Sequence, residues 1–257
     1  AQCWAKVKSS QGIRQRLEAA MAEPQEEAPG EPIEKVKSIR CRNVQFTYPS
    51  ASEPVLRDAS LSMDSPQKVA LVGESGCGKS TLAKLLFQYY PDYSGDILFN
   101  GRQVRDIDHT AFYQHIGYIA QTTYLFNDTL RRNICLLEDF SDEQLEHAIE
   151  AAGLTSLVAS LPDGLNTIIQ ENGKNLSGGQ RQRIGIARLA LRQYDLIIAD
   201  EITASLDPAT SQQVMEHLLA LPCMVVAITH DVSGVFMDQF DQIYRVEQGR
   251  STALQRG

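Results

Sequence analysis

The chain has 257 residues, of which 43% are hydrophobic and 22% are charged, and this composition predicts a globular protein with room for one large or two small domains. Its formal net charge of −8 argues against a nucleic-acid partner, which would need a basic surface. The five cysteines are scattered, which favours reduced thiols over a disulfide framework, and no apolar run approaches the roughly 18 residues that cross a bilayer.

The first part of the chain is expected to lie outside the compact domain. Residues 1–22 predict a helix with its apolar side chains roughly on one face, and residues 23–37 are rich in Pro and Glu, which is typical of an extended, solvated linker. The chain begins with Ala rather than Met, so we expect it to be a piece of a longer product.

Residues 38–257 alternate strands with helices, which predicts an α/β domain with a mainly parallel core. Two early strands, 39–48 and 55–63, are expected to form an antiparallel flank, and a helical insertion is expected at about 122–190. Ser141 and Gln144 predict a capping box, and Asp207 followed by Pro208 predicts another helix start. The other expected strands are 68–73, 96–101, 116–121, 195–200, 223–230 and 242–249, and a helix is expected at 79–88.

Residues 73–80 match the pattern G-x-x-x-x-G-K-[ST] between a predicted strand and a predicted helix. Glycines there allow the backbone N–H groups to wrap around phosphate oxygens. Lys79 can reach the β- and γ-phosphates, and the Ser80 hydroxyl can hold Mg²⁺. The residues expected to contact ATP in this loop are Gly73, Glu74, Ser75, Gly76, Cys77, Gly78, Lys79, Ser80 and Thr81.

Two acidic residues end the apolar strand "LIIADE". Ligands of open α/β sheets bind at the carboxyl ends of the strands, so this pair is placed for chemistry. Asp200 suits a Mg²⁺ ligand, and Glu201 is placed to polarise the water that attacks the γ-phosphate.

A second phosphate-binding element is predicted at "NLSGGQ", residues 175–180. Adjacent glycines at a helix start leave backbone N–H groups free at the positive end of the helix dipole. The chain therefore carries two phosphate-binding elements but only one predicted nucleotide pocket.

These motifs, in this order, resemble the nucleotide-binding domain of ATP-binding cassette (ABC) proteins. The stretches that carry the resemblance are "GESGCGKST", "YIAQTTYLF", "NLSGGQRQRI", "LIIADE", "ASLD" and "ITHD". The resemblance implies a RecA-like P-loop NTPase core with an antiparallel β flank and an inserted α-helical subdomain. It also implies ATP and Mg²⁺ as ligands, and a hydrolysing site because Glu201 is present.

The resemblance assigns further roles outside the phosphate loop. Tyr48 would stack on adenine, Gln121 would contact Mg²⁺ and the attacking water, and His230 would contact the γ-phosphate. Asp207 lies in the loop that links one active site to the other across a dimer. Two departures, Ala204 in "ASLD" and Ile202 after Glu201, could alter this communication.

The same resemblance explains the second phosphate-binding element. It implies that two chains join head to tail, so that the signature of one chain contacts the γ-phosphate held by the other. The signature residues are Ser177, Gly178, Gly179 and Gln180. The expected partner is therefore a second copy of this domain.

Among ABC proteins, the sequence favours an exporter on the cytoplasmic face of the cell membrane. Residues 1–22 resemble the cytosolic end of the last membrane-spanning helix, so a transmembrane domain of the same parent protein is expected as a partner. Residues 167–173 resemble the exporter loop that meets this domain, with Glu171 as the candidate contact and Asn172 in place of the usual arginine.

Several alternatives stay open at this point. Most of the motifs would also be found in three other kinds of protein. These are an importer-type ATPase subunit, a non-transport ABC ATPase and a regulatory nucleotide-binding protein without turnover. "ENGKNLSGGQ" is similar to exporters of peptides or bacteriocins, with lipids and drugs as alternatives for the exported molecule. That molecule is recognised in the membrane domain, which this sequence does not contain.

Overall fold

A computed structural model describes residues 30–136, 138–229 and 237–254 of the chain. The helix expected at 1–22 and the expected site residue His230 lie outside this described part. Within it, no helix is both long and apolar enough to cross a membrane.

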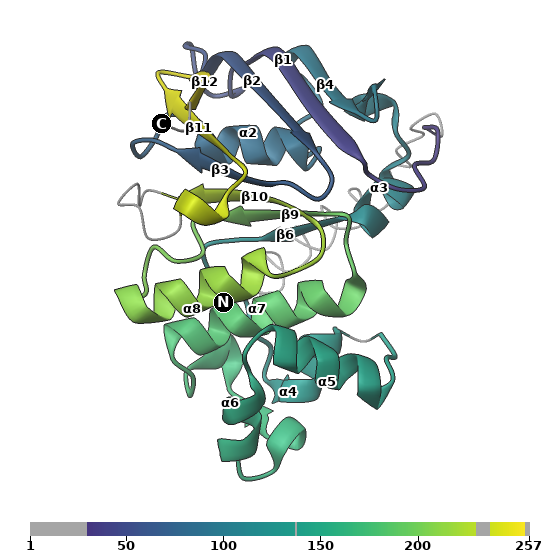
Figure 1. Cartoon of the computed structure of the whole chain (residues 1–257), viewed down its shortest axis with the longest axis vertical. Coiled ribbons are helices and arrows are strands. Elements are labelled where there is room, and N and C mark those ends of the chain that lie inside the picture. The colour runs from purple at the N-terminus through teal and green to yellow at the C-terminus, as the bar shows by residue number, and fades with distance from the viewer. Residues whose placement is uncertain (1–29, 137, 230–236, 255–257) are drawn as a thin grey trace, which may run out of the picture. The chain divides into compact units, whose positions relative to one another are not determined.

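The described part contains one large mixed sheet and a two-stranded sheet (Figure 1). The strands of the large sheet are β1 (Ser38–Phe46), β2 (Leu56–Asp64), β3 (Lys68–Val72), β4 (Ser94–Phe99), β5 (Arg102–Gln103), β6 (Ile116–Ile119), β9 (Leu196–Asp200), β10 (Met224–Thr229), β11 (Gln242–Glu247) and β12 (Arg250–Leu254). The small sheet joins β7 (Asp128–Thr129) to β8 (Ile168–Ile169).

The large sheet runs in the order β5-β4-β1-β2-β12-β11-β3-β10-β9-β6. Strands β11, β3, β10, β9 and β6 pair in parallel, whereas β1 pairs antiparallel with β2 and β4. The expected α/β class, with a mainly parallel core and an antiparallel flank, is therefore confirmed. Strand β12 was not expected, because its residues are mostly exposed and carry little apolar alternation.

Helices lie on both sides of the parallel strands. They are α2 (Lys79–Leu86), α3 (His109–His115), α4 (Leu130–Cys135), α5 (Asp142–Ala151), α6 (Thr155–Ser160), α7 (Gly178–Arg192) and α8 (Pro208–Leu219). Short 3₁₀ turns occur at Val104–Asp106, Gly164–Asn166, Glu171–Gly173 and Met237–Gln239. Helices α4 to α7 fall within the expected insertion, and α4, α5 and α6 lie at the end of the domain away from β1, β2 and β4 (Figure 1).

Two of these helices begin where the sequence predicts a helix start. The Ser141 side chain caps α5, and the side chain of Gln144 returns to the Ser141 backbone, which completes the capping box. Asp207 caps α8 through a hydrogen bond from the Thr210 N–H, and Pro208 occupies the first turn, where a missing N–H does no harm.

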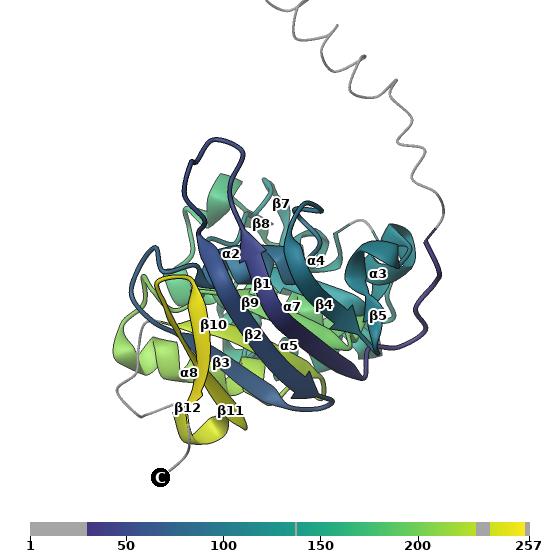
Figure 2. The same cartoon turned by 90° about the horizontal axis from the view of Figure 1, so that it is seen from above.

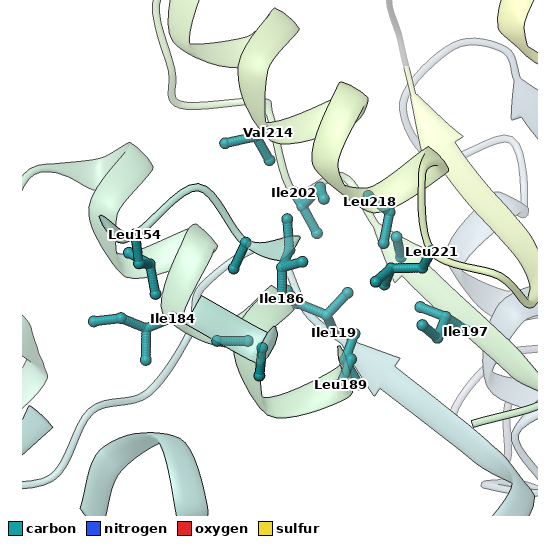
Figure 3. Close-up of a cluster of buried hydrophobic side chains, with 14 of the residues drawn as sticks. Ile119, Leu154, Ile184, Ile186, Leu189, Ile197, Ile202, Val214, Leu218 and Leu221 are labelled. Atoms are coloured by element: carbon teal, nitrogen blue, oxygen red, sulfur yellow. The ribbon is translucent and has the colours of Figure 1, made fainter. Parts of the chain in front are cut away.

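The central strands are apolar on both faces because helices or the flank cover each face. Side chains alternate between the two faces, so Val69 and Leu71 of β3 join one core while Ala70 and Val72 join the other. The first core lies around α2, between the flank and the parallel strands (Figures 1 and 2). The second lies between the sheet and helices α4 to α8, where Ile186, Ile197 and Leu218 are among the buried side chains (Figure 3).

The linker residues that the structure describes are held against the domain. A compact unit begins at Glu31, earlier in the chain than the expected start at Ser38. Val36 is fully buried and Ile33 is 8% exposed, and the Val36 N–H donates to the Asp195 carboxylate at 2.9 Å. These two apolar side chains gain free energy by burial, whereas the other described residues after Gly30 in this segment, Glu31, Pro32, Glu34, Lys35 and Lys37, are exposed.

Candidate functional site

The phosphate loop lies between β3 and α2, as expected, and its glycines are needed for space and backbone shape. A Cβ at Gly73 would lie 2.2 Å from the Val246 carbonyl oxygen, and one at Gly78 would lie 2.7 Å from Leu56 Cδ2. Gly78 also has a φ of 113°, which disfavours residues with side chains. The loop thus turns tightly into the helix.

The ammonium group of Lys79 points into this loop. It donates to the carbonyl oxygens of Gly73 at 2.8 Å and Glu74 at 2.7 Å, and the residue is only 3% exposed. Its Nζ atom also lies 3.8 Å from Cys77 Sγ. A positive charge is therefore held at the place where the loop would enclose phosphate oxygens.

Asp200 is the last residue of β9, and the parallel strands bring it to the start of α2. Ser80 Oγ donates to Asp200 Oδ1 at 2.8 Å, although the two residues are 120 apart in the sequence. Tyr118, at the end of the neighbouring strand β6, donates through its hydroxyl to Asp200 Oδ2 at 2.7 Å. Burial, followed by the hydrogen bond to Asp200, raises the pKa of Tyr118 above its usual value.

These oxygen atoms fit a magnesium ion. Mg²⁺ prefers hard oxygen ligands and commonly takes one or two protein groups together with phosphates and water. A hydroxyl and a carboxylate already within hydrogen-bonding distance supply such a pair. Elsewhere in the described part of the chain, no group of three or more His, Cys, Asp or Glu side chains could hold a metal ion.

Glu201 follows directly and has an uncommon backbone conformation. Its φ is +52°, in the left-handed region that a residue with a side chain rarely adopts. Its N–H donates to the Ile228 carbonyl at 3.2 Å, and its carbonyl accepts from the Ala204 N–H at 3.1 Å. Such strain often marks functional positions.

Tyr48 lies beside the phosphate loop. Its hydroxyl forms a 2.8 Å hydrogen bond with Thr81 Oγ1. Its ring meets Phe46 at 5.0 Å and Tyr90 at 5.5 Å, both edge to face. The half-buried tyrosine is thus fixed on the first turn of α2, next to the residues expected to bind phosphate.

Gln121 is exposed, and its backbone is tied to the helix that carries the signature. The buried side chain of Gln182, on α7, donates to the Gln121 carbonyl and accepts from Thr123 Oγ1 at 2.9 Å. Sequence reasoning assigned no role to Gln182 or Tyr118, although both lie in stretches that carry the resemblance. The signal that could have drawn attention to them is a polar group inside an otherwise apolar pattern, because such a group needs a partner when buried.

The signature residues begin α7. Ser177 is exposed and caps the helix, with Gln180 completing a second capping box. The atoms nearest to a Cβ added at Gly178 and at Gly179 belong to Leu206, at 2.9 Å, and to Thr210, at 2.2 Å. The signature therefore lies against the segment that contains Asp207, and the side chains of Ser177 and Gln180 each accept a hydrogen bond from the backbone of the other residue.

Asp207 remains an exposed helix cap in this structure. Its hydrogen bonds with Thr210 lower the pKa of its carboxyl below the usual value, so the side chain is ionised at neutral pH. Structure thus joins the expected residues in two groups, one around Lys79, Ser80 and Asp200 and one around the signature and Asp207.

The chain that carries these residues is similar to known proteins. The family model described as "ABC transporter" matches residues 56–204. The chain is 38% identical over 223 residues to an ATP-dependent lipid A-core flippase of Photobacterium profundum, covering 85% of this chain and 37% of that protein. It is 39% identical over 215 residues to the flippase of the same name from Salmonella typhimurium, covering 82% of this chain and 37% of that one.

The fold comparison agrees. A bacterial Atm1-family ABC exporter with ATP bound superposes with a TM-score of 0.81 at 31% identity, over 95% of this chain and 44% of that one. The chain thus spans less than half the length of each of these relatives. These matches support the exporter hypothesis rather than an importer subunit or a non-transport ATPase. The chain belongs to the ABC transporter family, and it is an exporter-type ATP-binding and ATP-hydrolysing domain.

Proposed function

We propose that this domain binds and hydrolyses ATP in sites shared between two copies, and that hydrolysis powers export by a membrane domain of the same longer protein. The observation that supports it most directly is the 2.8 Å hydrogen bond from Ser80 to Asp200, with Glu201 next in the chain. It joins a phosphate loop to an acidic strand end, which is the arrangement that phosphoryl transfer requires.

Within one site, the loop N–H groups and Lys79 would bind the phosphates, and Tyr48 would stack on adenine. Ser80, Asp200 and Gln121 would hold magnesium. When bound, this ion neutralises charge on the phosphate oxygens. The fixed contact of Tyr48 with Thr81 supports its placement, because it holds an aromatic ring beside the loop.

Glu201 would act as the general base. As the water oxygen attacks the γ-phosphorus and the bond to the ADP oxygen breaks, the Glu201 carboxylate takes a water proton. His230, the residue after Thr229 at the end of β10, would contact the γ-phosphate. The left-handed backbone of Glu201 supports this role, since that strain would serve to aim its side chain.

The signature would complete the site of a second copy arranged head to tail. A serine hydroxyl has one donor and two acceptor positions. Ser177 Oγ accepts from the Gln180 N–H at 3.2 Å, so its proton stays available for a γ-phosphate oxygen. The position of Asp207 supports its proposed role in communication between the two sites. Asp207 is next to Leu206 and close to Thr210, and both of these residues lie against the signature glycines.

For the whole protein, we propose a location at the cytoplasmic face of a membrane, with residues 1–22 leading from the last membrane-spanning helix. The flippases and the Atm1-family exporter support export as the activity. Substrate is bound by the membrane domain, so similarity of this domain to lipid A-core flippases favours neither a lipid nor a peptide.

The proposal is tested by Glu201→Gln. Loss of the general base is expected to lower ATP turnover by about 100-fold or more while ATP binding remains. The variant should then form a dimer only with ATP, measured by size-exclusion chromatography coupled to light scattering.

Glu146→Gln, the same change on the exposed face of α5, is the matched control and should behave like the original chain. Adding Ser177→Arg to Glu201→Gln should keep ATP binding and abolish the dimer. If Glu201→Gln hydrolyses ATP at the normal rate, Glu201 is not the general base. If this variant remains a monomer when ATP is added, the proposed shared site is wrong.

A further inference from the structure

The Asp200 carboxylate accepts a hydrogen bond on each of its two oxygens. Ser80 Oγ donates to Oδ1 at 2.8 Å, and the Tyr118 hydroxyl donates to Oδ2 at 2.7 Å. Ser80 belongs to the phosphate loop and is itself a candidate metal ligand. Tyr118 begins the stretch "YIAQTTYLF" that carries the resemblance, but the resemblance assigns it no role, so its hydroxyl requires a separate explanation.

Strand β9 and Phe87 determine where Tyr118 lies. Strand β6 pairs in parallel with β9, and Tyr118 is directly opposite Ile198, two residues before Asp200. Residues two apart on a strand share a face, so Tyr118 and Asp200 point to the same side of the sheet. The ring of Tyr118 packs 5.2 Å from Phe87, which follows α2, at an interplanar angle of 49°. The hydroxyl is thus positioned by the sheet and by α2.

The two hydrogen bonds fix the plane of the carboxylate. A carboxylate held through one oxygen can rotate about its last torsion, which is broad for Asp. A second bond to the other oxygen removes that freedom. The Tyr118 hydroxyl is the donor in this bond, because an ionised carboxylate can only accept.

We propose that Tyr118 is a positioning residue that orients Asp200 for magnesium binding. Tyr118 bonds to Oδ2 alone, and Oδ1 and the Ser80 oxygen, although hydrogen-bonded to each other, each keep a lone pair that can bind the metal. Groups that hydrogen-bond to a metal ligand commonly change metal affinity by 10-fold or more when removed. The inference rests on the proposed function, because it assigns a role toward the same magnesium ion.

A purely structural role is the competing explanation, and the chain offers a matched control. Tyr113 packs against the same Phe87 ring at 5.1 Å, also at 49°, but its hydroxyl lies 3.4 Å from the Phe87 carbonyl oxygen rather than on Asp200. Tyr118→Phe and Tyr113→Phe therefore each remove a phenol hydroxyl from a ring that packs on Phe87.

The test measures metal and nucleotide binding separately, on the 257-residue chain. Binding of Mn²⁺ in the presence of ATP is followed by electron paramagnetic resonance, and binding of a fluorescent ATP analogue is measured in EDTA. We expect Tyr118→Phe to weaken Mn²⁺ binding about 10-fold and to leave metal-free nucleotide affinity unchanged. Tyr113→Phe should change neither quantity.

Placing Tyr118→Phe in an Asp200→Asn background should produce no further loss, since the hydroxyl would act through that carboxylate. Tyr118→Met, which also lacks the hydroxyl and keeps an apolar contact with Phe87, replaces the phenylalanine variant if unfolding curves show that it does not fold.

The inference is overturned if folded Tyr118→Phe binds Mn²⁺ as the original chain does, or if it loses metal-free nucleotide affinity to the same extent. The outcome also separates the two proposals. If the original chain shows no Mn²⁺ binding dependent on ATP, the proposed function fails. If the original chain binds normally and only the Tyr118 effect is missing, the positioning role alone fails.

Discussion

Gly179 shows how the absence of one side chain lets two parts of the proposed site meet. It lies inside a regular helix, so glycine is needed there because a side chain would not fit, and not because the backbone is unusual. A Cβ there would be 2.2 Å from Thr210 Cγ2, a distance that real atoms do not adopt. The signature therefore needs glycine at this position to reach the start of α8.

This contact predicts a rescue between two substitutions. Gly179→Ala should lower the free energy of unfolding by about 1–3 kcal/mol, as expected for overpacking. Thr210→Ser removes the clashing methyl group and keeps the hydroxyl, so it should restore most of the loss in the double variant. Urea unfolding of all four proteins measures the coupling. Additive effects would show that the clash is not the cause.

At the scale of elements, helices α5 and α7 begin with the same S-x-x-Q capping box. The reciprocal hydrogen bonds are 2.9 and 3.2 Å at Ser141 and Gln144, and 2.8 and 3.2 Å at Ser177 and Gln180. As helix caps the two boxes are nearly identical. Only the second is proposed to contact the ATP of another chain.

The pair allows capping to be separated from recognition. Ser141→Ala and Ser177→Ala should each cost about 1 kcal/mol of stability, because each removes one helix cap. In the Glu201→Gln background, only Ser177→Ala should weaken the ATP-dependent dimer, as measured by its dissociation in size-exclusion chromatography. Equal dimerisation of both variants would mean that Ser177 acts as a cap alone.

At the scale of the whole molecule, the segment before β1 ties the chain entry to the parallel core. Glu31 exchanges backbone hydrogen bonds with Asp106 and Asp108, and its side chain pairs with Arg102 at 2.8 Å. The Val36 N–H reaches Asp195, the residue just before β9, whose far end carries Asp200. The segment is thus attached to the strand that leads into the site.

Truncation tests how much this attachment stabilises the domain. The reference is a chain that starts at Glu31, the first residue of the compact unit. One that starts at Ser38 loses the burial of Ile33 and Val36, which should cost about 2–4 kcal/mol. Equal midpoints for the two truncated chains would show that the segment contributes nothing to folding.

By itself, the sequence determined the family, the order of the main elements and the motifs of the site. Such features are local, because they depend on neighbours along the chain. They are the glycine spacing in residues 73–80, the apolar runs that end in acidic residues, and the helix caps at Ser141 and Asp207. Contacts between distant residues were decided only by tertiary structure. Tyr118 and Asp200 are 82 residues apart, and Val36 and Asp195 are 159 apart. No periodicity encodes such pairs, because the partner is selected when strands align in the sheet and helices pack on it.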